Sequence, residues 1–117
     1  MHGFCHIELV TSNLEQSAEI YRKLFGWEIQ PMMEGYWMIT LDGNARGVSG
    51  GLLKVDEVVD NGGQNYIEVS DIDATLSRAA SLGAKTIQEK RPLPENMGFI
   101  GMFEMPDGYK LGIFSQK

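Results

Sequence analysis

The chain contains an internal repeat, and a repeat restricts the possible folds more than any other feature of a sequence. Residues 6–15 read HIELVTSNLE and residues 64–73 read QNYIEVSDID, at an offset of 58. In each copy a strand-like run leads into Ser, an acid or amide, an aliphatic residue and a second acid. The 117 residues are therefore expected to fold as two related modules. Each module is too small to be stable alone, so the two should pack together.

An amphipathic helix is predicted after the strand of each copy. The Ser-x-x-acid pattern is typical of a capping box, in which Ser12 or Ser70 would accept a hydrogen bond from a backbone N–H of the first turn. Apolar residues follow at helical spacing. The helices should end at Gly26 and Gly83, because glycine readily adopts the left-handed conformation found after a last helical turn.

Three strand-like stretches follow each helix, separated by turns rich in Gly, Pro and Asp. They cover about 27–32, 36–42 and 46–54 in the first copy, and about 85–91, 98–105 and 109–115 in the second. The sequence thus predicts an α+β fold of two tandem βαβββ modules. We place them at about 1–55 and 64–117, joined by a linker over 56–63, within one domain spanning 1–117.

The charge balance excludes some classes of partner. With 10 basic and 16 acidic residues, the chain carries a net charge of −6, so neither nucleic acid nor an anionic membrane is expected to bind. The one cysteine, Cys5, can form no internal disulfide, which suits the cytoplasm, and we expect it to be an inert buried thiol. No apolar run approaches the roughly 20 residues of a membrane span, and the N-terminus lacks the pattern of an export signal.

The sequence resembles the vicinal oxygen chelate superfamily, which includes glyoxalase I, bleomycin and fosfomycin resistance proteins and extradiol dioxygenases. It is most similar to the small bacterial glyoxalase-related proteins. The segments that carry the resemblance are 6–10, 12–15, 21–22, 24–27, 66–73, 82–85 and 105–109. The resemblance implies a curved, cup-shaped mixed sheet with the helices outside, a small-molecule ligand in the cup, and assembly into a homodimer.

Metal-binding members of this superfamily place ligands at four equivalent strand positions, two in each module. The resemblance implies that His6 occupies the first position and Gln64 its counterpart in the second module. The last-strand position falls on Gly112, and the remaining one near Leu52 or Leu53. Since three of the four positions lack a ligand side chain, no cofactor is predicted; a divalent metal held by displaced ligands such as His6, Glu8 and Glu68 is the less favoured alternative.

Strand alternation assigns side chains to the cup. In the first strand His6 and Glu8 share one face, while Cys5, Ile7 and Leu9 share the face toward the helix. An imidazole and a carboxylate together suit proton transfer next to a carbonyl, so His6 and Glu8 are the predicted catalytic pair. The same argument gives the predicted substrate-binding residues of the second module: Gln64, Tyr66, Glu68, Lys110 and Phe114.

Two functions remain open at this stage. One is a metal-independent isomerase or lyase acting on a small oxygenated substrate. The other is a bleomycin-resistance-like protein that sequesters a hydrophobic or cationic molecule without catalysis, since acidic and aromatic side chains would suit a cation. A metal-dependent glyoxalase or dioxygenase ranks third.

Overall fold

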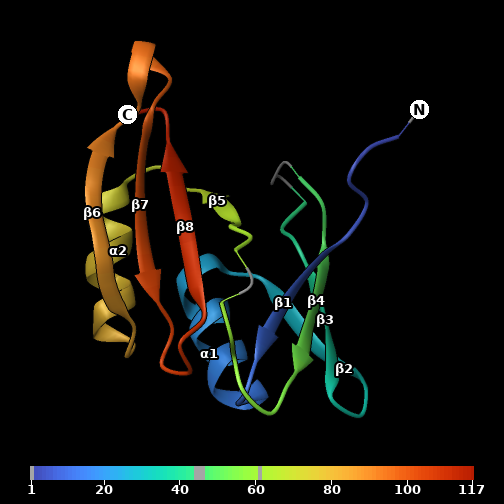
Figure 1. Ribbon diagram of the computed structural model, residues 1–117. Coiled ribbons are helices and arrows are strands. Elements are labelled where there is room, and N and C mark those ends of the chain that lie inside the picture. Colours follow the sequence, from blue (N-terminus) through green and yellow to red (C-terminus); the bar gives the residue numbers. More distant parts are fainter. Residues whose placement is uncertain (1, 44–46, 61) are drawn as a thin grey trace. The chain divides into compact units, whose positions relative to one another are not determined.

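The computed structural model of the chain describes residues 2–43, 47–60 and 62–117. It divides into two compact units, Met1–Val58 and Val59–Lys117. Each unit contains one helix and one four-stranded mixed sheet (Figure 1), so the predicted α+β architecture of two βαβββ modules is confirmed. None of the helices in the part of the chain that the structure describes has the length and hydropathy that a membrane crossing requires.

The first unit runs β1, α1, β2, β3, β4, and its sheet has the order β1-β4-β3-β2. Strand β1 pairs in parallel with β4, and the other pairs are antiparallel. The bounds are β1 Ile7–Thr11, α1 Leu14–Phe25, β2 Glu28–Met33, β3 Tyr36–Thr40 and β4 Gly50–Lys54. The strand predicted over 46–54 and the turn expected before it fall partly on 44–46, outside the described residues. The strand that is observed begins only at Gly50.

The second unit repeats this plan as β5, α2, β6, β7, β8, with the sheet order β5-β8-β7-β6. Again the first strand pairs in parallel with the last. The bounds are β5 Tyr66–Glu68, α2 Ile72–Ser81, β6 Lys85–Pro92, a 3-10 turn over Pro94–Asn96, β7 Phe99–Glu104 and β8 Lys110–Ser115. The three strands predicted after each helix are all present in the two units, within a few residues of their expected ends.

The hydrophobic core of each unit lies between its helix and one face of its sheet. In the first unit Leu9 of β1 pairs with Leu52 of β4, and both are buried together with Tyr21 of α1. In the second unit Leu111 and Ile113 of β8 are buried with Ile72 of α2. Because side chains alternate along a strand, the residues between these core positions lie on the opposite face of each sheet.

That opposite face carries the same cross-strand row in both units. Gly51 of β4 pairs with Met38 of β3, which pairs with Gln30 of β2. In the second unit Gly112 of β8 pairs with Met102 of β7, which pairs with Gln88 of β6. We call these two sets the glycine–methionine–glutamine rows. The first strands differ beside them, since Glu8 pairs with Gly51 whereas Tyr66 pairs with Gly112.

The helices begin one residue later than the capping-box prediction required. Asn13 and Asp71 are the N-terminal caps, and their side chains accept from the N–H groups of Gln16 at 3.1 Å and Ala74 at 3.0 Å. The prediction that Ser12 and Ser70 cap the helices is therefore wrong. The N-terminal cap is the residue immediately before the first helical residue, and its side chain accepts from a backbone N–H two or three residues further along the chain. Because the helices start at Leu14 and Ile72, the capping positions are 13 and 71. Gly26 is the left-handed C-terminal cap with φ 71°, and Gly83, with φ 110°, follows the Leu82 cap.

Removing either cap should destabilise the protein. We expect Asn13→Ala and Asp71→Ala each to lower the free energy of unfolding by about 1 kcal/mol, because an N–H of the first turn loses its acceptor. Both tryptophans, Trp27 and Trp37, lie in the first unit, so urea unfolding followed by their fluorescence reports Asn13→Ala. Helical circular dichroism reports Asp71→Ala. Ser70→Ala is the control, and a cost as large as that of Asp71→Ala would contradict the assignment.

Candidate functional site

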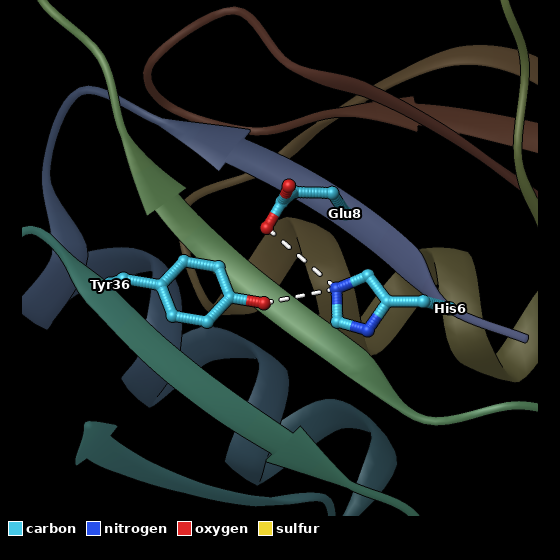
Figure 2. A network of polar contacts seen from close by, with 3 residues as sticks. All are labelled: His6, Glu8 and Tyr36. Carbon is cyan, nitrogen blue, oxygen red and sulfur yellow. Dashed lines mark hydrogen bonds and ion pairs between the residues drawn. The ribbon is translucent and has the colours of Figure 1, made fainter. Parts of the chain in front are cut away.

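Three polar side chains meet on the face of the first sheet that points away from the core. His6 lies directly before β1, Glu8 lies within β1, and Tyr36 is the first residue of β3. The Tyr36 hydroxyl is 2.9 Å from Nε2 of His6, and the same nitrogen is 3.7 Å from Oε1 of Glu8. Figure 2 shows the Nε2 edge of the imidazole turned toward both of the other groups. The predicted sharing of a face by His6 and Glu8 agrees with this arrangement.

Gly51 makes room for this cluster. A Cβ atom at position 51 would lie 1.9 Å from the Tyr36 hydroxyl and 2.2 Å from the ring carbon that bears it. The Tyr36 ring therefore extends across β4 at a position that only glycine leaves open, and in this way it reaches the first strand. The cluster depends on the absence of a side chain as well as on the three side chains present.

The cluster is accessible and polar. The side chains of His6 and Glu8 are 42% and 44% exposed, so an incoming molecule can contact both. Burial raises the pKa of the Tyr36 hydroxyl above its ordinary value, and hydrogen bonding with Glu8 and the negative charge of that carboxylate raise the pKa further. The phenol consequently keeps its proton at neutral pH. An imidazole, a carboxylate and a protonated phenol in contact can accept, hold and return a proton.

Tyr36 is a site residue that the sequence reasoning missed. It is 30 residues from His6 in the chain, and neither spacing nor the repeat connects the two. The available signal is indirect: the Glu34-Gly35 turn opens the strand at Tyr36. The pairing of β3 with β4 then places its side chain on the face that carries Glu8.

In the second unit the predicted substrate-binding residues lie on or next to the two parallel strands. Tyr66 is 46% exposed, and its ring covers Gly112, where a Cβ atom would lie 2.5 Å from two ring carbons. Glu68 pairs in register with Phe114, so both lie on the face that carries Tyr66.

The two remaining candidates of this unit have partners close by. Lys110 lies 3.8 Å, between Nζ and Oδ2, from Asp60. Gln64 precedes β5, and its side-chain amide donates to the carbonyl of Asn65 at 3.2 Å. Both side chains are exposed, so a ligand could exchange for these surface contacts.

Cys5 is exposed, and the prediction of a buried thiol is wrong. Strand β1 begins only at Ile7, so the alternation that buries Leu9 does not extend back to Cys5.

The first-strand and last-strand positions do not form a metal site within either unit. The register makes Gly51 the counterpart of Gly112, because these two glycines pair with the equivalent residues Glu8 and Tyr66. The fourth position thus falls on Gly51 rather than on Leu52 or Leu53, and it too has no ligand side chain. Tyrosine rings occupy the space next to both glycines. Within the described residues of either unit, no three His, Cys, Asp or Glu side chains lie close enough together to hold a metal ion.

Comparison with known proteins gives one family and a consistent fold. The sequence model of the Glyoxalase/Bleomycin resistance protein/Dioxygenase superfamily matches residues 3–113. A glyoxylase-like domain-containing protein from Didymella fabae is 28% identical over 96 residues, which cover 76% of this chain and 75% of that protein.

Two solved structures illustrate the fold. A glyoxalase-related enzyme from Fulvimarina pelagi superposes with a TM-score of 0.74 at 18% identity, over 98% of this chain and 88% of that one. A mutant of the fosfomycin resistance protein FosX from Listeria monocytogenes, complexed with Mn(II) and 1S,2S-dihydroxypropylphosphonic acid, superposes with a TM-score of 0.77 at 15% identity, over 97% and 90%.

Proposed function

Since the chain belongs to the glyoxalase/bleomycin resistance protein/dioxygenase superfamily, we propose that it is a small-molecule enzyme that moves a proton next to a carbonyl group, as an isomerase or lyase does, without a metal ion. His6 and Glu8 are the catalytic pair. The observation that carries this proposal is the accessible contact between the imidazole and the carboxylate, 3.7 Å apart on one sheet face. The proposal also includes a cytoplasmic location and assembly into a homodimer. The single cysteine supports the location, and the family resemblance supports the assembly.

The chemistry follows from the two side chains. Abstraction of a proton from a carbon next to a carbonyl requires a base within hydrogen-bond reach and a group that keeps the base in the correct protonation state. A neutral imidazole can accept the proton, and a neighbouring carboxylate stabilises the imidazolium that forms. His6 and Glu8 have these two properties and are both accessible.

The metal-independent form of the proposal is supported by the residues at the four expected positions. His6 is kept, Gln64 bonds to a neighbouring backbone carbonyl, and Gly51 and Gly112 lie against tyrosine rings. Carboxylates and imidazoles are the side chains that divalent transition metals require in sites of this kind. A protein that used a metal here would need ligands that these positions do not supply.

The second module would contribute the substrate-binding residues Gln64, Tyr66, Glu68, Lys110 and Phe114. Tyr66 offers an exposed ring fixed against Gly112, which suits stacking with the apolar part of a ligand. The amide of Gln64 and the ammonium of Lys110 are donors for the oxygens of a small oxygenated substrate, and Glu68 is an acceptor for its hydroxyl groups.

Proton exchange into the substrate tests this function directly. A panel of small α-hydroxyketones and α-hydroxyaldehydes is incubated with the protein in D₂O, and the α-proton signal is followed by ¹H NMR. We expect at least one compound to lose this signal in a protein-dependent manner, at the same rate with and without EDTA. Exchange that appears only after Mn²⁺, Ni²⁺ or Zn²⁺ is added would contradict the metal-independent mechanism.

A second candidate, sequestration without catalysis, is favoured by the exposed ring of Tyr66 together with Glu68 two residues away in the same strand. An aromatic face beside a carboxylate attracts an organic cation. If this is the function, calorimetric titration with small aromatic cations gives saturable binding, and the exchange assay detects no product with any compound of the panel.

A further inference from the structure

We propose that the substrate carries an unbranched hydrocarbon chain, which binds on a row of apolar side chains beside the catalytic pair. The row consists of Val10 of β1, Leu53 of β4, Tyr36 of β3 and Met33 of β2, and we call it the apolar row. This inference rests on the proposed function for the reaction at the polar end of the ligand. The binding of the chain itself can be measured without any reaction.

The strand register makes these four residues neighbours across the whole first sheet. Val10 pairs with Leu53, and Leu53 pairs with Tyr36. Tyr36 in turn pairs with Met33, which follows the bulge in β2. Residues that lie directly opposite each other have their side chains on the same face of the sheet. Because neighbouring strands are about 4.8 Å apart, the row runs for roughly 14 Å over the four strands.

The row is accessible on the face that carries the polar cluster. Met33 is 60% exposed, and the other three residues of the row are half-buried. None of the four side chains carries a charge. A hydrocarbon that covers them removes apolar surface of both partners from water, which favours binding. The row is one side chain wide and four long, and this shape fits an unbranched chain better than a bulky ring.

The second sheet has charged residues at both ends of the equivalent row. Glu8 and Tyr66 are equivalent positions, because each pairs with the corresponding glycine of the last strand in its unit. The apolar row begins two residues after Glu8, and its counterpart begins two residues after Tyr66. That counterpart consists of Glu68, Phe114, Ile100 and Arg91. Of the two rows, the one that is apolar from edge to edge belongs to the unit that contains the catalytic pair.

Tyr36 belongs to both the apolar row and the polar cluster. Its hydroxyl is 2.9 Å from Nε2 of His6, and Figure 2 shows this end of the side chain directed toward the imidazole. On the first strand Val10 lies two residues beyond Glu8, on the same face. A ligand whose carbonyl end contacts His6 and Glu8 therefore has the apolar row directly beside it. The structure thus favours a small amphiphile, with oxygens at one end and a hydrocarbon chain at the other.

Two diols that cannot react test the row by binding alone. 1,2-Propanediol and 1,2-octanediol share the same polar end, differ in the length of the chain and contain no carbonyl group. Each is titrated into protein that carries ¹³C in its methionine methyl groups, and Met33→Gln identifies the Met33 signal by its loss. We expect octanediol to shift this signal and to bind at least about tenfold more tightly than propanediol. Each CH₂ group that leaves water strengthens binding by up to about fourfold.

Substitutions within the row should remove the preference for the longer chain. Met33→Gln and Val10→Thr roughly keep the size of the side chain but replace apolar atoms with polar ones. We expect each to weaken octanediol binding by about threefold or more and to leave propanediol binding unchanged. Met97→Gln is the matched control, because Met97 is also 60% exposed but lies in the turn before β7 of the second unit. It should change neither affinity.

The α-proton exchange assay separates this inference from the proposed function. With both correct, kcat/KM for exchange rises from 1-hydroxy-2-propanone to 1-hydroxy-2-octanone through a lower KM, because the row binds the chain equally in the ground state and the transition state. Binding of the diols that depends on chain length, without exchange of any ketone, would support the apolar row and remove the proposed function.

Three results would overturn the apolar row. One is exchange with equal kcat/KM along the ketone series together with equal affinities for the two diols, which would leave the proposed function intact. Another is octanediol binding that is unchanged in folded Met33→Gln and Val10→Thr. The third is a Met33 methyl signal that shifts with protein concentration and not with the diol, which would mean that a second copy of the chain covers this face.

Discussion

His6→Ala should lower the rate of α-proton exchange by roughly 10²–10⁴-fold, the contribution expected of a positioned general base. The physical reason is that alanine has no imidazole to act as the base. The fold should be unaffected, because the imidazole is exposed and lies before the first strand. The exchange assay gives the rate, and urea unfolding followed by tryptophan fluorescence confirms that the unit is intact.

Two further variants define what the His6 result means. Glu8→Gln keeps the size of the side chain but removes the negative charge that stabilises the imidazolium, so we expect the rate to fall here as well. Glu57→Gln removes one negative charge from the acidic stretch after β4 and should leave the rate unchanged. If His6→Ala retained full exchange activity, the catalytic pair would be wrong and the protein would be better described as a binder.

Gly50→Ala should destabilise the first unit more than any cap substitution, by at least about 3 kcal/mol, the upper end of the cost of overpacking. A Cβ atom at position 50 would lie 1.7 Å from the backbone oxygen of Ile7, its partner in β1. Unlike a flexible side chain, a backbone oxygen in a ladder cannot move aside, so β1 must separate from β4. The tryptophan fluorescence of urea unfolding measures this loss in the unit concerned.

Gly43→Ala is the matched control for this substitution. Position 43 has no heavy atom within 4 Å of an added Cβ, and its φ is not in the left-handed region. The free energy of unfolding of Gly43→Ala should therefore differ from that of the unsubstituted protein by less than about 0.5 kcal/mol. If the urea midpoint of Gly50→Ala equalled that of the unsubstituted protein, β1 and β4 would not pair in the register given above.

The order of helices and strands could be predicted because it depends on local sequence patterns. The offset of 58, the apolar spacing of the helices and the turn residues each depend on neighbours in sequence, and the two modules follow from them. Local patterns also placed His6 and Glu8 on one face, since alternation along a strand needs no knowledge of its partners.

Cross-strand neighbours could not be predicted in this way. Tyr36 reaches His6 only because β3 pairs with β4 in a given register and because Gly51 leaves space between them. Register depends on two segments that are distant in sequence, so the residues of one strand do not determine which residues of the other strand they pair with. The same limit explains why the fourth expected ligand position was placed at Leu52 or Leu53 instead of Gly51. The cap and Cys5 errors arose at the ends of elements, where a shift of one or two residues changes a side chain's environment.

The glycine–methionine–glutamine rows have a practical consequence for engineering the chain. Both sheets have this row across their last three strands in the sheet order, while the first strands β1 and β5 carry Glu8 in one copy and Tyr66 in the other. The two copies thus share this row and differ in the residue beside it on the first strand. A library intended to change ligand preference should vary positions 64, 66 and 68 and leave the catalytic pair and both glycines, Gly51 and Gly112, fixed. Variation along an edge strand disturbs one ladder, whereas variation at Gly51 or Gly112, which lie on interior strands, disturbs two.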